Sequence, residues 1–135
     1  MTKIVPFLCI TALLACAGTA AAQGPIAAGQ TVTGALAQDD QAQSDGSRFD
    51  AWTYSGKRGE RLTITLKSTA FDAYLTLGRG DGGAFKEMKT DDDGGGGSDS
   101  QIVVVLPADG EYVIRAGSLV GDSYGEYTLR VVSRA

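Results

Sequence analysis

The sequence predicts an all-β domain, a β-sandwich or jelly roll of about eight short antiparallel strands. Apolar and polar residues alternate with a period of two in short runs, and glycine and aspartate separate these runs. No window shows the 3.6-residue period with caps that a helix requires. Many short strands with turn signals between them are typical of sandwiches and jelly rolls. We therefore expect almost no helix.

The clearest strand is expected over residues 60–68. Leu62, Ile64 and Leu66 point to one side of this segment, whereas its threonine, arginine and lysine side chains point to the other. This alternation predicts one buried and one solvated face. The same criterion predicts seven further strands over residues 30–36, 48–55, 71–78, 85–90, 101–106, 111–116 and 126–132. Residues 102–106 are apolar at every position, which predicts a central strand covered on both faces.

Residues 1–22 are expected to be a secretory signal peptide. Lys3 precedes an apolar stretch over 4–17, and the small residues 18–22 end in an Ala-x-Ala pattern that predicts cleavage after Ala22. We expect residues 23–28 to be a flexible arm and residues 29–133 to be one folded domain. This organisation predicts a secreted or periplasmic bacterial protein.

Both cysteines, Cys9 and Cys16, lie in this leader, so the processed domain is expected to have no disulfide. Residues 13–16 also resemble a lipobox, which would make Cys16 a lipid-anchored N-terminus. The two processing sites therefore remain alternatives. After the leader, no apolar run approaches the ~20 residues of a transmembrane helix, so none is expected.

The charge distribution argues against a nucleic-acid partner. The formal net charge is −4, and removal of Lys3 with the leader makes it about −5. The remaining basic residues are scattered along the chain, whereas binding to a phosphate backbone needs a clustered positive field.

Four motifs occur in a characteristic order: Phe-Asp-Ala-Tyr-Leu over 71–75, Asp-Asp-Asp-Gly over 91–94, Leu-Pro-Ala-Asp-Gly-Glu-Tyr over 106–112, and Gly-Glu-Tyr-Thr-Leu over 125–129. Together they resemble the bacterial pre-peptidase C-terminal (PPC) domain family, over roughly residues 29–132. The resemblance implies a β-sandwich found mostly at the C-terminal ends of secreted bacterial proteases and other exported proteins. It also implies a role in binding or secretion without catalysis, and the related collagen-binding domains bind calcium.

The chain contains no histidine, and its processed part is expected to contain no cysteine. A Ser-His-Asp or Cys-His arrangement and a zinc site ligated by histidine or cysteine therefore cannot form. Paired carboxylates remain, as in a glycosidase. The aspartates lie in glycine-rich turns where water is expected to keep their pKa values ordinary, so we expect no enzyme.

Residues 91–99 are the most suggestive candidate site. Asp91, Asp92, Asp93 and Asp99, joined by Asp72, offer several of the six to eight oxygens that Ca²⁺ prefers. The spacing is not that of an EF-hand. The alternative is a solvated turn in which glycines provide positive φ and aspartates keep a sheet edge soluble.

Most aromatic residues are expected in the core, because Trp52 and Tyr54 share one strand face and Tyr112 and Tyr127 begin apolar alternations. Tyr124 lies in a loop and is the aromatic residue expected to be exposed, which makes it a candidate for ligand binding.

The leading hypothesis is an exported, non-catalytic binding or accessory module that recognises an extracellular or envelope protein or polysaccharide, with a structural calcium ion. Two alternatives remain. One is a chaperone-like or structural partner of an exported enzyme that offers a strand edge for β-augmentation. The other is a glycosidase that uses two carboxylates.

Overall fold

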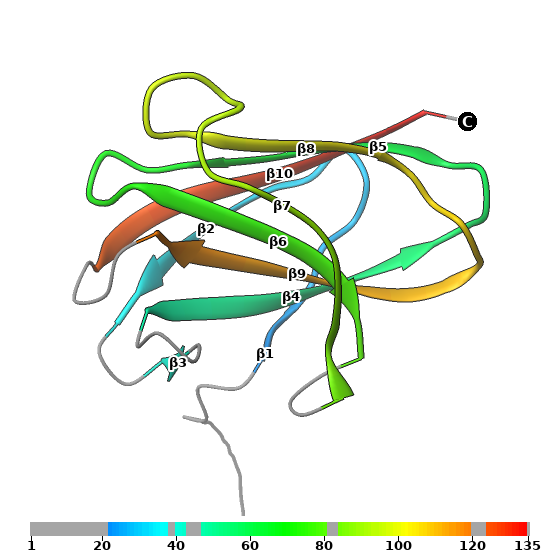
Figure 1. Cartoon of the computed structure of the whole chain (residues 1–135), viewed down its shortest axis with the longest axis horizontal. Coiled ribbons are helices and arrows are strands. Elements are labelled where there is room, and N and C mark those ends of the chain that lie inside the picture. Colours follow the sequence, from blue (N-terminus) through cyan, green and yellow to red (C-terminus); the bar gives the residue numbers. More distant parts are fainter. Residues whose placement is uncertain (1–21, 38–39, 43–46, 81–83, 120–123, 135) are drawn as a thin grey trace, which may run out of the picture.

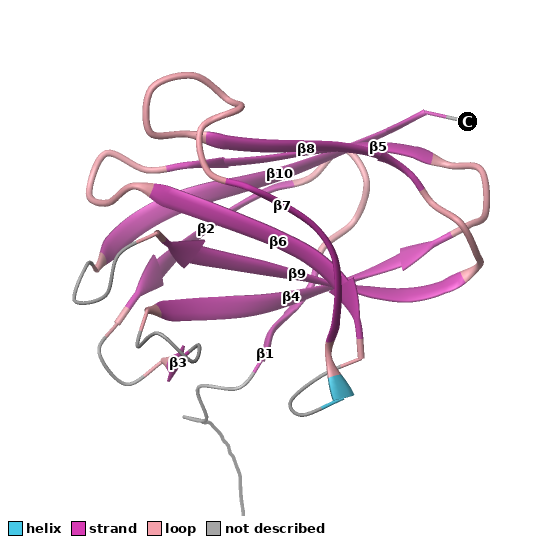
Figure 2. Ribbon diagram, viewed as in Figure 1, coloured by secondary structure: helices cyan, strands magenta, loops and turns pink. Residues whose placement is uncertain are grey.

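The computed structural model describes residues 22–37, 40–42, 47–80, 84–119 and 124–134, which form two packed β-sheets (Figure 1). These residues contain no α-helix, only a 3₁₀ position at Ala84 (Figure 2). They therefore include no long apolar helix of the kind that crosses a membrane. The ten strands are β1 (Ala22–Pro25), β2 (Thr31–Leu36), β3 (Gln41–Ala42), β4 (Arg48–Gly56), β5 (Arg61–Lys67), β6 (Ala73–Arg79), β7 (Lys86–Asp91), β8 (Ser100–Val105), β9 (Gly110–Ser118) and β10 (Gly125–Arg134).

The first sheet has the order β1-β4-β9-β6-β7, with β3 paired to β4, and the second has the order β2-β10-β5-β8. All strand pairs are antiparallel except β1 with β4. The predicted β-sandwich and its eight strands are confirmed, because period-two alternation identifies segments that bury one face. Most consecutive strands belong to different sheets, so the connecting loops gather at the two ends of the sandwich (Figure 1).

The core lies between the two sheets and contains the inward side chains of their strands. Leu62, Ile64 and Leu66 of β5 are fully buried, as their alternation predicts. Four aromatic residues expected in the core are also buried: Trp52, Tyr54, Tyr112 and Tyr127.

A buried hydrogen-bonded group links the sheets through this core. The Tyr127 hydroxyl on β10 donates to Asp50 Oδ2 at 2.6 Å and accepts from Trp52 Nε1 at 3.0 Å, both residues belonging to β4. Burial and the bond to Asp50 raise the pKa of Tyr127, so its phenol stays protonated. A Cβ atom on Gly34 would lie 2.4 Å from this hydroxyl. Glycine at this position of β2 therefore makes room for the link between the sheets.

The prediction of a central strand over residues 102–106 is wrong. β8 is an edge strand of its sheet, paired with β5. Ile102 is fully buried, but Val103 and Val105 on the outward face are 42% and 50% exposed. An apolar run shows which residue types a strand contains, but not how many neighbours the strand has.

The expected flexible arm over residues 23–28 is also wrong for most of its length. Residues 22–25 form β1, which pairs with β4 in parallel. Ile26 then lies in the core with 3% exposure, and its backbone N–H donates to the Thr53 carbonyl at 2.9 Å. The burial of Ile26 and the pairing of β1 with the backbone of β4 fix this segment. The sandwich therefore begins before residue 29. The predicted leader features in residues 1–21, including Cys9 and Cys16, lie outside the described residues.

Candidate functional site

The predicted calcium ligands gather at one end of the sandwich, where three connections meet. The connection between β5 and β6 carries Asp72, whose carbonyl accepts from the Leu119 N–H at 2.8 Å. The next residue, Ala73, donates its N–H to the Ser98 carbonyl of the β7–β8 connection at 2.9 Å. We call residues 92–99 the acidic loop.

Two of the five aspartates already bind the backbone. Asp91 Oδ2 accepts from the N–H groups of Gly94 at 2.6 Å and Gln101 at 2.8 Å, so it fixes the start and end of the acidic loop. Asp99 Oδ1 accepts a longer bond of 3.4 Å from the Ser68 N–H. These two carboxylates have a structural role whether or not a metal binds.

The other three aspartates affect one another through charge. The pKa of Asp93 is raised, first by the charge of Asp92, then by partial desolvation and by the charge of Asp91, with a further contribution from Asp72. The structure therefore brings Asp72 and the acidic loop together, as expected from the sequence. In the part of the chain that the structure describes, however, no group of three or more carboxylates, histidines or cysteines has a geometry suited to a metal ion. Calcium binding stays a prediction.

Tyr124 lies at the same end, immediately before β10. Its neighbour Gly125 packs on Ala70, where an added Cβ would lie 2.4 Å from the alanine Cβ. Tyr124 is half-buried and has interactions of its own, so less of its ring is open to a ligand than its loop position predicts.

The opposite end of the sandwich contains a polar group that the sequence did not predict. Glu60 Oε2 accepts from the hydroxyls of Tyr54, at 2.5 Å, and Ser133, and its Oε1 accepts from the Lys57 N–H at 3.1 Å. Burial acts to raise the pKa of Glu60, but the bonds from Ser133 and Tyr54 outweigh it and the pKa is lowered. A carboxylate with a lowered pKa is a poor general acid, so this group joins strands of the two sheets rather than forming a catalytic centre.

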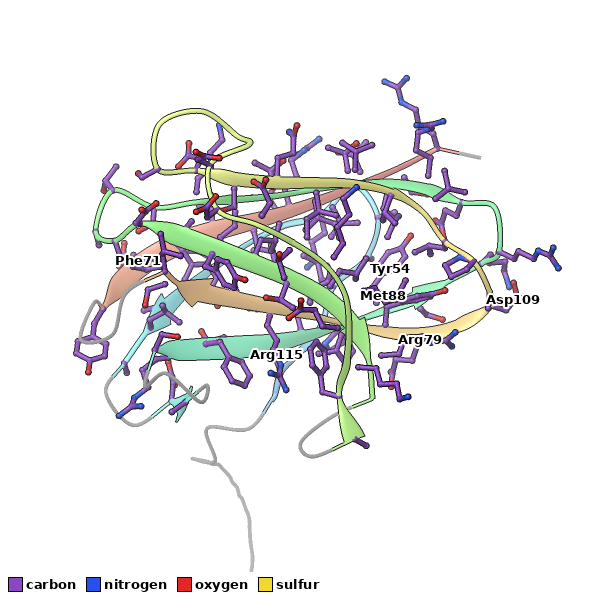
Figure 3. All side chains as sticks on the ribbon, in the orientation of Figure 1. Tyr54, Phe71, Arg79, Met88, Asp109 and Arg115 are labelled. Atoms are coloured by element: carbon purple, nitrogen blue, oxygen red, sulfur yellow. The ribbon has the colours of Figure 1, made fainter. Side chains whose placement is uncertain are left out.

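The outward residues of β4, β9 and β6 form what we call the closed face. Arg115 points outward from β9 (Figure 3), and its guanidinium lies 4.2 Å from the ring centre of Phe49 and 3.7 Å from that of Phe85. Burial lowers the pKa of Arg115, while the charge of Glu87 opposes the shift. Glycines make this stack possible: a Cβ on Gly78 would lie 2.5 Å from the Phe85 ring. Phe49 is only 3% exposed, so the protein covers this face with its own side chains.

The outward residues of β2, β10, β5 and β8 form what we call the open face. Strand register arranges them in rows across the sheet, Thr31–Arg130–Thr65–Gln101 and Thr33–Thr128–Lys67. A shallow hollow of about 360 Å³ lies over the first row and extends to Lys67 and Thr128. A neighbouring hollow of about 320 Å³ shares Lys67 and Thr128 and also contains Asp99 and Glu126. No described strand covers this face.

Comparison with known proteins assigns the chain to a family. The model of the bacterial pre-peptidase C-terminal domain matches residues 48–118, more than half of the chain. The chain belongs to the PPC domain family. No curated protein matches it significantly. The matched segment runs from β4 to β9 and contains the acidic loop, whereas two strands of the open face, β2 and β10, lie outside it.

Solved structures show the same fold at low sequence identity. The PPC domain of a collagenase from Bacillus anthracis superposes with a TM-score of 0.58 and 14% identity, over 82% of this chain and 95% of that one. The periplasmic g-type lysozyme inhibitor PliG of Aeromonas hydrophila gives a TM-score of 0.59 and 17% identity, over 82% and 96%. PliG of Salmonella Typhimurium gives 0.50 and 13%, over 82% and 98%. At these identities the likeness supports the PPC sandwich fold and does not identify a ligand.

Proposed function

We propose that this PPC domain is an exported, non-catalytic binding module that recognises a polysaccharide or a protein outside the cytoplasm. The observation that carries this proposal is the open face. It presents rows of threonine hydroxyls and long cationic side chains over four strands, with two shallow hollows and no described strand above it. An extended polar surface of this kind suits a long ligand better than a small substrate, which needs an enclosing pocket.

Binding and location are tested together. The processed chain is incubated with envelope polysaccharide and envelope protein fractions of its native bacterium, and retained material is identified. Thr128→Glu introduces an acidic side chain on the open face. Ser55→Glu introduces the same side chain at an exposed position of β4 and serves as the control. We expect Thr128→Glu to lose binding and Ser55→Glu to keep it; equal loss in both would remove the open face as the binding surface. Mass spectrometry of the exported protein distinguishes cleavage after Ala22 from lipidation at Cys16.

The structural neighbours motivate a specific protein ligand. The Aeromonas hydrophila neighbour is a periplasmic inhibitor of g-type lysozyme. A lysis assay with g-type lysozyme, with and without this domain, tests whether the shared fold extends to shared function. Inhibition that Thr128→Glu leaves unchanged would place such a site outside the open face.

A second candidate function, a chaperone-like or structural partner, is favoured by the free edge of β2. Among the described strands, β2 pairs only with β10. Its residues 31–36 contain no charge and no proline, the features with which proteins usually protect an edge from pairing. An extended segment of an exported enzyme would add a strand here. Ala35→Pro tests this edge, because Ala35 is exposed and lines neither hollow of the open face. The change should abolish such pairing but leave binding to a polysaccharide intact.

Within this proposal, a calcium ion bound near Asp72, Asp92 and Asp93 orders the acidic loop. The support is the placement of Asp72 beside the acidic loop, where the Ala73 N–H donates to the Ser98 carbonyl, together with the raised pKa of Asp93 beside Asp92. Asp91 and Asp99 contribute less, because the backbone already occupies an oxygen of each. Asp99 and Glu126 are two carboxylates that line one hollow of the open face. Release of reducing ends during the binding assay would support a carboxylate glycosidase instead.

A further inference from the structure

The open face carries positive charge on a protein that is acidic as a whole. Arg61, Lys67, Arg130 and Arg134 all lie on outward positions of β5 and β10, whereas Glu126 is the one acidic residue in the same described rows. The chain has a net charge of −4. Clustering of cations on one face of an acidic protein is not explained by solubility, which either sign provides.

The cations on either side of the first hollow are not bound to carboxylates within it. The Arg130 guanidinium donates to the Thr31 hydroxyl at 3.1 Å, a neutral acceptor. Lys67 is exposed and lines both hollows, the second of which also contains Asp99 and Glu126. Their charges are therefore available to a ligand, and the hydrogen bond to Thr31 holds one of the two cations in place.

The hollow of about 360 Å³ between these two cations has a suitable lining for an anionic sugar. Hydroxyls of Thr31, Thr65 and Thr128 surround it, and Gln101 adds an amide that donates to Thr65 at 3.3 Å. No carboxylate is among its described lining residues. Hydroxyl and amide groups both donate and accept, as sugar hydroxyls do, while the cations recognise acidic groups.

The residue types on this face argue against other ligand classes. No aromatic side chain occupies an outward position of β2, β10, β5 or β8 in the described rows, so a neutral sugar or an unstacked base finds no stacking platform. The face also lacks the tyrosine and tryptophan anchors that dominate protein interfaces. Apart from the exposed Val103 and Val105 on edge strand β8, recognition must then depend on charge and hydrogen bonds along an extended surface.

We propose that the open face binds an acidic polysaccharide, with its anionic groups between Lys67 and Arg130. This inference rests on the proposed binding function and names the ligand class. The acidic loop borders one end of the face, since Gly95 belongs to the lining. The polymer therefore extends away from the loop, toward Arg61 and Arg134, which face each other across β5 and β10.

The test uses polygalacturonate as the acidic probe and dextran as the neutral one, with calorimetry on the processed chain in chelator. We expect binding to polygalacturonate alone, weakening as salt is added. The double variant Lys67→Gln/Arg130→Gln should bind about tenfold more weakly, roughly the effect of losing two charge contacts at the surface. The matched variant Arg58→Gln/Lys86→Gln removes the same charge from exposed positions outside the open face and should keep the affinity.

Three results would overturn the inference while leaving a binding function in place. They are equal affinity for dextran, equal affinity for poly-L-glutamate or a thymidine oligonucleotide, and binding that requires Ca²⁺ and ignores the Lys67/Arg130 change. If the domain retains neither polygalacturonate nor any fraction of the native envelope, the proposed function itself fails. Circular dichroism of both double variants confirms that a loss of binding is not a loss of fold.

Discussion

The two outer faces of the sandwich are built from strands of similar length, yet they differ in how their side chains are used. On the closed face, two phenylalanine rings cover an arginine, and Phe49 and Thr76 are almost inaccessible to water. On the open face, threonines and cations remain in solvent. The closed face thus contributes to stability as a small additional core, whereas the open face keeps its polar groups free for a ligand.

Glycine accounts for much of this difference. Gly78 on the closed face leaves room for the ring of Phe85, which an added Cβ would approach to 2.5 Å. At Gly117 an added Cβ would lie 2.9 Å from the Arg48 carbonyl oxygen and 3.2 Å from the Phe49 Cβ. The described outward positions of the open face contain no glycine. A position without a Cβ lets a large neighbouring side chain lie flat on the sheet.

The largest effect is expected from Phe49→Ala, which removes a 3%-exposed ring from the closed face. We expect a loss of about 3 kcal/mol in the free energy of unfolding, which is in the range for replacing a buried phenylalanine by alanine. Urea denaturation measures it. Val103→Ala on the open face deletes a 42%-exposed side chain and should cost no more than about 0.5 kcal/mol. Similar losses in the two variants would show that the faces do not differ in packing.

A smaller effect is expected from Gly78→Ala. Its Cβ would meet the Lys86 carbonyl at 2.3 Å and the Phe85 ring at 2.5 Å, so the ring must leave Arg115 and the β6–β7 pair must shift. We expect a loss of about 2 kcal/mol in unfolding free energy. Adding Phe85→Ala should make the double variant less destabilised than the sum of the single ones. Strict additivity would mean that the clash involves the backbone alone and that the ring does not depend on the glycine.

Glu60 tests the coupling between the two sheets, because it accepts bonds from Tyr54 on β4 and Ser133 on β10. Its pKa is lowered in the folded protein, so its ionised form stabilises the fold above the unfolded pKa of about 4.3, and this contribution is lost as the pH falls through the folded pKa. Glu60→Gln should therefore lower the melting temperature at neutral pH, and the difference should shrink below about pH 4. Glu111→Gln, at an exposed position of β9, should show no such pH dependence.

The smallest effect is expected from Asp93→Asn in the acidic loop, which connects β7 of one sheet to β8 of the other. The raised pKa of Asp93 means that its ionised form is disfavoured in the fold, so this charge costs stability at neutral pH and the cost disappears as the pH falls. In chelator, Asp93→Asn should raise the melting temperature slightly. If calcium binds, the same change should lower the melting temperature in excess Ca²⁺. A rise of equal size in both conditions would identify the acidic loop as a solvated turn.

The strands were predictable because half-buried strands leave a local signal. Leu62, Ile64 and Leu66 show their common face without reference to any other part of the chain. The position of a strand within a sheet leaves no such signal. β8 carries apolar residues on both faces, as a central strand does, but Val103 and Val105 lie on an exposed face at the sheet edge. Likewise, nothing in residues 22–26 indicates that the edge of β4 will fix them.

The acidic end was predictable in composition, and the two outer faces were not. The aspartates of the acidic loop are neighbours in sequence, and Asp72 was expected to join them. The expectation of ordinary pKa values does not hold for Asp93, because the charge of Asp92 and of the other nearby carboxylates raises its pKa. Phe49, Phe85 and Arg115 come from three distant segments. The cations of the open face are scattered along the sequence, and only strand register places Lys67 and Arg130 around one hollow.

The hydrogen bond between Trp52 and Tyr127 also provides a natural optical probe. Trp52 is the only tryptophan of the chain, it is 7% exposed, and its indole N–H is bound to a residue of the opposite sheet. Indole emission moves to longer wavelength when the ring passes from an apolar interior into water. The fluorescence of the unlabelled protein therefore reports directly whether its two halves are docked.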